Sequence, residues 1–445
     1  MRRVFRSRSV LLPDGMRPAT VHVRDGIIER IGAYEDAPSN ELVDGGSVVL
    51  MPGLVDTHVH LNEPGRADWE GFASGTLAAA AGGVTTLVDM PLNSIPATVN
   101  VAALGAKREA AAGKCVVDVA FWGGVVPGNT ADLEPLWHAG VCGFKCFLAP
   151  SGVAEFEHVT EADLIAALPI LARLGAPLLV HAELPAHLHG GGPAHASYAA
   201  YLESRPQRAE TEAVALLVRL AREHGAHIHV VHVSAAGTLA LLRQAGEDGI
   251  AVSAETCPHY LTFDAASIAD DATAFKCAPP IRAAVHREAL WQGLASGALD
   301  HVASDHSPAP PDLKKGDWFD AWGGIASVQV ALSATWTGAR RRGHSLADVV
   351  RWMAERPARL AGLSAHKGAI APGRDADLVL FAPDTEWTVS AHALHHRHAT
   401  TPYDGLRLYG RVQSTWLRGA RIYSNGSGTE GRHGQCIERH ATGGA

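Results

Sequence analysis

The stretch Gly53-Leu54-Val55-Asp56-Thr57-His58-Val59-His60-Leu61-Asn62-Glu63-Pro64-Gly65 is the starting point for interpreting this chain. A short apolar run leads into two histidines at i and i+2, and Pro-Gly then ends the pattern. In an extended strand these two side chains point to the same side, so His58 and His60 can aim at one point. Neutral imidazole nitrogen is a common ligand of divalent metals. A histidine pair on a polar strand face is the competing interpretation.

Composition limits the classes of protein to be considered. The chain has 445 residues, of which 47% are hydrophobic and 19% charged, enough to bury a large core. A formal charge of −8 does not favour binding to nucleic acid or to acidic membranes, which are themselves negatively charged. The six cysteines form no C-x-x-C pair, and no apolar run has the length of a signal sequence or a membrane span. We therefore expect a cytoplasmic protein with reduced thiols and no membrane partner.

After Pro52, short apolar segments alternate with Ala- and Leu-rich segments of helical character. The expected strands are residues 54–58, 84–90, 116–122, 143–148, 177–181, 227–232, 250–254 and 301–304. Eight strands separated by helices favour an α/β fold with a (β/α)8 TIM-like barrel over residues 52–368. A doubly wound sheet is the alternative, but no Gly-x-Gly-x-x-Gly follows the first strand.

Both chain ends have strand-like patterns. Asp25-Gly26 stands between alternating runs, which is a hairpin signal, and short β segments return after residue 368. We expect residues 1–51 and 369–425 to form one small β-sandwich domain beside the barrel. Residues 426–445 are rich in Gly and Ser at their start and predict a flexible tail.

Polar residues stand where five of the expected strands end, which is where such barrels collect their chemistry. They are His58 and His60 on the first strand, Lys145 on the fourth, His181 on the fifth, His232 on the sixth and Asp305 on the eighth. Each alone has an ordinary explanation, such as a hydrogen-bonded core histidine or a turn aspartate. Together they predict a metal centre.

Lys145 requires a separate argument, because an ammonium ion cannot bind a cation. A lysine amine in a desolvated site is partly neutral and can take up carbon dioxide to become an anionic carbamate. That carbamate could bridge two metal ions, one held by the histidines of the first strand and Asp305, the other by His181 and His232. Water between two zinc ions loses its proton near neutral pH and becomes a nucleophile. Asp305 would accept that proton and pass it to a leaving nitrogen.

Several motifs resemble one family of enzymes. They are His-Val-His-Leu-Asn-Glu-Pro-Gly-Arg (58–66), Gly-Gly-Val-Thr-Thr (82–86), Met-Pro-Leu-Asn (90–93), Gly-Phe-Lys-Cys-Phe (143–147), Cys-Pro-His-Tyr (257–260), Lys-Cys-Ala-Pro-Pro-Ile-Arg (276–282), Ser-Asp-His-Ser-Pro (304–308) and Ala-Trp-Gly-Gly-Ile (321–325). From about residue 4 to residue 425 the chain resembles the cyclic amidohydrolases, which include dihydroorotases, hydantoinases/dihydropyrimidinases and allantoinases. Within this group it is most similar to the allantoinases. The resemblance implies two divalent metal ions, expected to be zinc, on the same six residues with a carboxylated Lys145. It also implies a homo-oligomer, often a tetramer, that opens the hydantoin ring of allantoin to give allantoate.

Four positions depart from the dihydroorotase pattern: Asn62, Leu92, Ala278 and Ala309 stand where those enzymes have polar groups suited to an anionic ring. A pocket without a cation would bind a carboxylate poorly, whereas neutral allantoin needs hydrogen bonds alone. Candidates for those bonds are Asn93, Ser307 and the backbone near Ala278 and Gly323.

Two other functions stay open: a hydantoinase or dihydropyrimidinase, and an inactive scaffold homologue, which would lack some of the six ligands. Elsewhere, the four histidines of residues 391–398 predict a solvated loop, and His259 and His306 are expected near the site.

Overall fold

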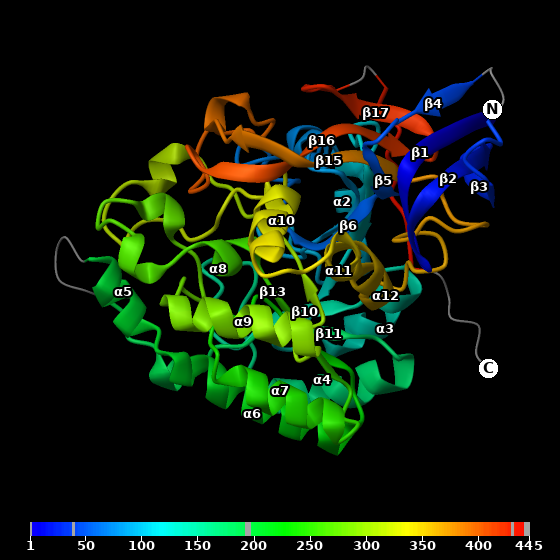
Figure 1. The fold of residues 1–445 in the computed structure, drawn as a ribbon. Helices are drawn as coiled ribbons and strands as arrows, with labels where there is room; N and C mark the ends of the chain where they lie inside the picture. The colour runs from blue at the N-terminus through cyan, green and yellow to red at the C-terminus, as the bar shows by residue number, and fades with distance from the viewer. Residues whose placement is uncertain (1, 38–40, 192–196, 429–430, 440–445) are drawn as a thin grey trace.

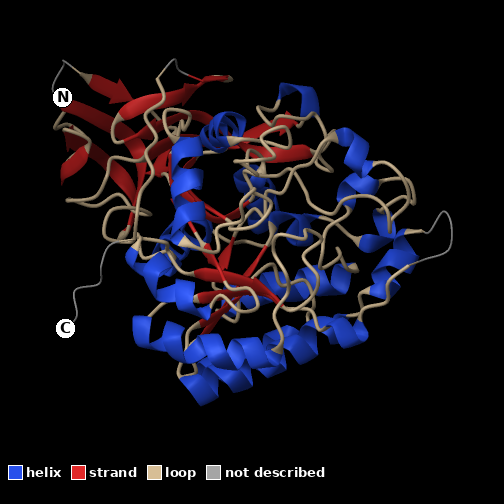
Figure 2. Cartoon of the chain, turned by 180° about the vertical axis from the view of Figure 1, so that it is seen from behind, coloured by secondary structure: helices blue, strands red, loops and turns tan. Residues whose placement is uncertain are grey.

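The structure is a computed structural model that describes residues 2–37, 41–191, 197–428 and 431–439. It is a mixed α/β fold in which parallel strands lie inside and helices lie around them (Figure 1). Seen from behind, the strands occupy the centre of the larger part, with helices along its outer edge (Figure 2). Within the described residues, no helix combines the length and apolar character needed to cross a membrane.

The central strands form two parallel sheets. One contains β6 (Leu54–Val59), β7 (Val84–Asp89) and β8 (Asp118–Phe121), and the other contains β9 (Gly123–Gly124), β10 (Phe144–Phe147), β11 (Leu178–His181), β12 (Ile228–Val230), β13 (Val252–Thr256) and β14 (His301–Val302). Each of the eight strands expected from the sequence overlaps one of these. Their side chains are almost all buried, because helices and the sheet interior cover both faces.

Helices connect and cover these strands. They are α1 (Phe72–Ala81), α2 (Val101–Ala111), α3 (Thr130–His138), α4 (Glu161–Leu174), α5 (Tyr198–Ser204), α6 (Gln207–His224), α7 (Thr238–Glu247), α8 (Pro258–Thr262), α9 (Ala284–Ser296), α10 (Ala331–Arg341), α11 (Leu346–Val350) and α12 (Arg356–Leu360), with the turn η5 (Arg351–Glu355) between the last two. Local sequence sets their limits. Helix α4, for example, begins at a capping box between Thr160 and Asp163 and ends at Gly175, whose φ of 66° is left-handed.

Strands from both chain ends share a third sheet, which has nine strands. Its order is β18 (Ser427–Gly428), β17 (Ala420–Ser424), β16 (Arg407–Leu417), β15 (Leu378–Thr388), β5 (Val49–Pro52), β1 (Arg2–Leu12), β2 (Gly15–Arg24) and β3 (Ile27–Gly32), with β4 (Leu42–Asp44) paired to β1. The two ends meet where β5 runs antiparallel to β15, with Met51 opposite Val379. The blue and orange strands therefore lie side by side in Figure 1. The predicted hairpin is confirmed, since β2 and β3 are antiparallel on either side of Asp25-Gly26.

A buried ion cluster joins this sheet to the parallel strands. Lys367 Nζ lies 2.6 Å from an oxygen of Asp118 on β8, 2.7 Å from Asp375 and 2.8 Å from Asp377, which precedes β15. Arg418 contacts Asp118 as well. The buried ammonium of Lys367 thus contacts three carboxylates from two distant parts of the chain, and Arg418 adds a second positive charge.

Residues 431–439 of the predicted flexible tail contact the parallel-strand region. Val119 of β8 donates its N–H to the Gln435 carbonyl, and Ile437 donates to the Val119 carbonyl, both at 2.9 Å. The Arg439 guanidinium lies 3.3 Å from the centre of the Trp137 ring on α3. The free edge of β8 offers these backbone partners, so a segment without its own apolar pattern is held in place. Residues 429–430 and 440–445 of the predicted tail lie outside the described residues.

Candidate metal centre and substrate cavity

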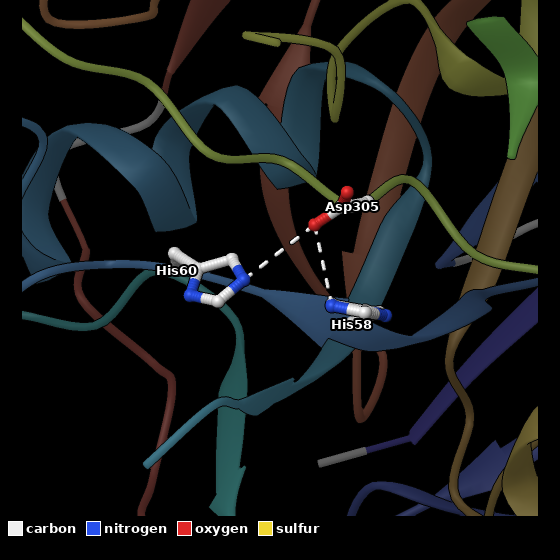
Figure 3. Close-up of side chains that lie close together, drawn as sticks. All are labelled: His58, His60 and Asp305. Carbon is white, nitrogen blue, oxygen red and sulfur yellow. Dashed lines mark ion pairs between the residues drawn. The ribbon is translucent and has the colours of Figure 1, made fainter. Parts of the chain in front are cut away.

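His58, His60 and Asp305 meet at the carboxyl end of the parallel strands (Figure 3). His58 lies on β6, His60 follows it, and Asp305 follows β14. Oδ1 of Asp305 lies 3.2 Å from Nε2 of His58 and 3.5 Å from Nε2 of His60. The two strand ends are joined directly, because the His60 N–H donates to the His306 carbonyl at 2.8 Å. Three ligand-type atoms, contributed by the first and the last of the parallel strands, therefore converge on one point.

Lys145, His181 and His232 form the adjoining group. Nδ1 of His181, at the end of β11, lies 3.1 Å from Nε2 of His232, which follows β12. The rings of His58 and His232 are 5.4 Å apart between centres, so the two groups are neighbours. Lys145 on β10 is 0% exposed, and its Nζ has no hydrogen-bond partner in the described part of the chain. It lies 4.7 Å from the centre of the Phe147 ring.

The protonation of these groups suits cation binding. Burial lowers the pKa of Lys145 to about 8 and also lowers the pKa values of His60, His181 and His232. Burial opposes ionisation of Asp305, but the charge of His58 and a hydrogen bond from His60 outweigh it and lower the pKa of that carboxyl. At neutral pH the site therefore combines the neutral imidazoles of His60, His181 and His232 with an ionised aspartate.

Two buried glutamates that sequence reasoning missed hold the histidines in place. Glu255, at the end of β13, accepts a hydrogen bond from His58, and Glu183 lies 2.7 Å from Nε2 of His181. Arg205 in turn donates to Glu183 from Nε at 3.1 Å. The sequence did contain a signal, since a charged residue within or just after a buried strand needs a partner. Such carboxylates fix ring orientation and the tautomer of a metal-binding histidine.

A cavity of about 460 Å³ opens above the histidines and Asp305. All four residues predicted to contact substrate line it: Asn93, Ala278, Ser307 and Gly323. Five of the six predicted metal ligands line it as well, whereas Lys145 lies beneath the surface. Of the four positions that depart from the dihydroorotase pattern, Leu92 and Ala278 line the cavity, but Asn62 and Ala309 do not. The Asn62 side chain turns instead to the Pro308 carbonyl, at 3.3 Å.

Two lysines hold one wall of this cavity. Lys276 Nζ donates to the Phe319 carbonyl at 3.1 Å and to Ala321, and Lys314 Nζ donates to Trp322 at 2.9 Å and to Gly324. Burial lowers their pKa values to about 8 and about 7 respectively. Residues 319–324, which include Gly323, are thereby tied to the rest of the molecule through their main-chain oxygens.

The backbone is strained at several of these positions. Positive φ angles occur at Asn93 (65°), His232 (40°) and Asp305 (45°), none of which is glycine. Such conformations cost of order 1–3 kcal/mol each and persist where surrounding structure enforces them. They turn three side chains of the candidate site toward the cavity and away from the regular strand direction.

The remaining histidine predictions have mixed outcomes. His259 is fully buried within 4.8 Å of Cys257 and Asp305, as expected for a residue near the site. The solvated loop predicted for residues 391–398 is wrong at His396, which is buried with its ring 4.9 Å from that of His306. The sequence pattern gives no sign of this contact, because the two residues are ninety positions apart.

Comparison with known proteins assigns the chain to a class of hydrolases. Residues 49–422 match the model of the amidohydrolase family, and the chain belongs to that family. It is 51% identical to an allantoinase of Streptomyces avermitilis, over 98% of each chain. It is 44% identical to an allantoinase of Arabidopsis thaliana, over 94% of this chain and 88% of the relative. Among solved structures, an L-hydantoinase (dihydropyrimidinase) from Arthrobacter aurescens superposes with a TM-score of 0.92 at 31% identity, over 99% of this chain and 100% of that one.

Proposed function

We propose that this protein hydrolyses the hydantoin ring amide of allantoin to give allantoate. The observation that carries the proposal is the convergence of four buried histidines, an ionised aspartate and an unpaired buried lysine below a cavity. The substrate follows from near-full-length similarity to allantoinases of a bacterium and a plant. The inactive scaffold homologue is disfavoured, because all six ligand-type residues are present.

We propose that His58, His60, Lys145, His181, His232 and Asp305 hold two divalent metal ions, most simply zinc. The residues fit such ions: Nζ of Lys145 and Nδ1 of His232 are buried atoms without a hydrogen-bond partner among the described residues. Buried polar atoms of this kind call for a ligand. Nitrogen and carboxylate oxygen are the ligands that zinc accepts.

Lys145 is the residue we propose to be carboxylated. Its neutral amine attacks carbon dioxide, an N–C bond forms, and one proton is released, which leaves an anionic carbamate. The lowered pKa favours the neutral amine that this reaction requires. The Phe147 ring beside Nζ keeps water away from the amine before reaction.

Bound metal ions would supply a water of lowered pKa and would polarise the scissile carbonyl. Asp305 then acts as general base and acid. Its carboxylate accepts the proton as the water oxygen bonds to the ring carbonyl carbon. It gives that proton to the ring nitrogen as the C–N bond breaks, so the atoms of one water are consumed. The lowered pKa of Asp305 keeps it ionised and ready to accept.

Substrate contacts are proposed at the cavity wall. Asn93 Oδ1 is buried and has no hydrogen-bond partner among the described residues, so it can accept from a ureido N–H. Ser307 and main-chain groups at Ala278 and Gly323 supply further polar contacts. Leu92 and Ala278 place no charge against the ring, and the two cations that also line the cavity are engaged elsewhere, Arg205 with Glu183 and Lys276 with main-chain carbonyls. This arrangement suits neutral allantoin better than an anionic ring.

A hydantoinase or dihydropyrimidinase is the second candidate, because the solved structure of an L-hydantoinase superposes so fully. The two are separated by incubating metal-replete protein with allantoin, hydantoin, dihydrouracil and dihydroorotate and quantifying the ring-opened products. Turnover of allantoin above the other rings supports the proposal. Preference for hydantoin or dihydrouracil would support cyclic-amide hydrolysis but contradict allantoin as the substrate.

We also infer that the parallel strands close into the predicted barrel. Val59, the last residue of β6, bridges in parallel to His306 after β14, and the N–H of Cys142, before β10, donates to the Phe121 carbonyl of β8 at 2.9 Å. The first link joins β6 to the segment after β14, and the second joins β8 to the segment before β10, so together they support a closed barrel.

A small β-sandwich domain of residues 1–51 and 369–425, a tetrameric assembly and a cytoplasmic location stay predictions.

A further inference from the structure

A second cavity, of about 440 Å³, lies at the opposite end of the parallel strands from the metal-binding residues. Its walls come from residues just before β10, β11, β12 and β14, from α3, α12 and the C-terminal segment. The lining includes Trp137, Cys142, Pro177, His227, Arg356, Arg359 and Arg439. A volume of this size accommodates a small organic molecule.

Three guanidinium groups surround this cavity without a carboxylate partner among the described residues. Arg356 donates to the Asp300 carbonyl at 2.7 Å, and Arg439 donates to the carbonyls of Trp137 at 2.8 Å and Val141 at 3.1 Å. The Arg359 side chain is exposed and makes no contact with another described residue that would neutralise it. Carbonyl oxygens accept hydrogen bonds but leave the positive charges in place.

Negative charge in the lining is limited to the Asp300 carboxylate among the described residues. Its Oδ2 already accepts the N–H of Ala254 at 2.8 Å, so part of its capacity is used. His227 and His229 contribute no negative charge, and both contact Oγ of Ser253 at 2.8 Å. The local field therefore favours an anion.

Part of the remaining lining is apolar. Cys142, Pro177 and Leu360 cover one side, and the Trp137 ring lies beneath the Arg439 guanidinium. An anion that also carries a flat or apolar group could contact both the arginines and the apolar side chains. A guanidinium group can donate two hydrogen bonds to the two oxygens of a carboxylate or of a phosphate, so either head group is suitable.

We propose that this cavity is a binding site for a small organic anion, with its phosphate or carboxylate head at Arg356, Arg359 and Arg439 and its apolar body against Cys142, Pro177 and Leu360. The site is separate from the proposed catalytic cavity. Its inner wall includes His229 and His301, which both contact Glu255, so a ligand here would rest against residues that help to hold His58.

The test is titration calorimetry on the metal-replete protein with phenyl phosphate, benzoate and inorganic phosphate at low ionic strength. We expect phenyl phosphate or benzoate to bind once per chain, more tightly than inorganic phosphate, and more weakly as salt is added. Tighter phenyl phosphate indicates a phosphate ester as the natural class, and tighter benzoate indicates a carboxylate.

Variants separate this cavity from the metal centre, which could also bind these probes. Arg359→Ala should weaken binding about fivefold or more and leave ring hydrolysis unchanged, because Arg359 makes no contact with the catalytic cavity. Arg341→Ala, an exposed arginine on α10, is the matched control and should bind as the unmodified protein does. The proposal is overturned if no probe binds, or if Arg359→Ala binds as tightly as the control. Because binding is measured without turnover, failure here leaves the proposed hydrolase function untouched.

Discussion

Glu255 accepts a hydrogen bond from Nδ1 of His58 at 2.5 Å, across 197 positions of sequence. Its other oxygen lies 3.2 Å from Nε2 of His229 and 2.9 Å from Nε2 of His301. Burial opposes ionisation of Glu255, but the charge of His58 and these hydrogen bonds outweigh it and lower the pKa of its carboxyl. Because a carboxylate can only accept, the proton of this bond lies on Nδ1 of His58, and Nε2 faces Asp305 at 3.2 Å.

Replacing Glu255 should therefore weaken metal binding without removing a ligand. Glu255→Gln keeps the shape but can present an amide N–H toward His58, so the ring loses its fixed tautomer. We expect the affinity for the more weakly held metal to fall about 10–100-fold. Competition with a chelator, followed by elemental analysis, measures this change. Glu247→Gln on the exposed end of α7 is the control, and equal metal retention in both variants would contradict the assigned role.

Lys145 provides the test of carboxylation. Lys145→Ala should lose one metal per chain and lower kcat by about 100-fold or more, because the proposed carbamate could no longer form. Added acetate or propionate should restore part of the activity by filling the space of the missing carbamate. Lys315→Ala, exposed near the Lys314 position, is the control. Full metal content and activity in Lys145→Ala would refute the bridging role.

The rate of carboxylation should depend on pH with a definite sign. Burial lowers the pKa of Lys145 to about 8, and the neutral amine that reacts with carbon dioxide prevails above that value. Metal-free protein supplied with metal and bicarbonate should therefore regain activity faster at pH 9 than at pH 7 when the dissolved carbon dioxide concentration is held equal. The time course of recovered allantoin hydrolysis is the measurement. A rate that is equal at both values would contradict a buried amine as the acceptor.

Lys314 should make stability depend on pH. Its pKa is about 7 in the folded protein because burial disfavours the charge, whereas a lysine in an unfolded chain titrates near 10.4. Between these values the unfolded chain holds a proton that the folded chain does not, so stability rises with pH. Lys314→Met removes this contribution. The unfolding free energy of the variant minus that of the unmodified protein should therefore be larger at pH 7 than at pH 10. Urea unfolding at the two values, with Lys315→Met as control, measures the difference.

The Lys367 cluster should govern how firmly the nine-stranded sheet is attached. Lys367→Met leaves Asp118, Asp375 and Asp377 close together with Arg418 as the remaining nearby cation. Removing one partner of a buried ion pair costs about 3–5 kcal/mol in the free energy of unfolding. Denaturant unfolding should report a loss of this size. The double variant Lys367→Met with Asp377→Asn should recover part of it, and no recovery would show that packing, not charge, dominates.

Sequence by itself determined the elements of the candidate site. Alternation of short apolar segments with helical ones predicted all eight expected strands, and residues on these strands or just after them include all six proposed ligands. This works because a strand's direction and its side-chain alternation are local properties. The lining of the catalytic cavity by Asn93, Ala278, Ser307 and Gly323 was also predictable, although from resemblance.

Tertiary structure alone decided the contacts between distant segments. The hydrogen bond from His58 to Glu255, the burial of His396 against His306 and the attachment of residues 431–439 to β8 have no periodic signature in the sequence. Each depends on groups that are brought together when the parallel strands assemble and that must find polar partners once water is excluded. Local pattern therefore fixed which residues face the site, whereas long-range packing fixed which atoms hold them there.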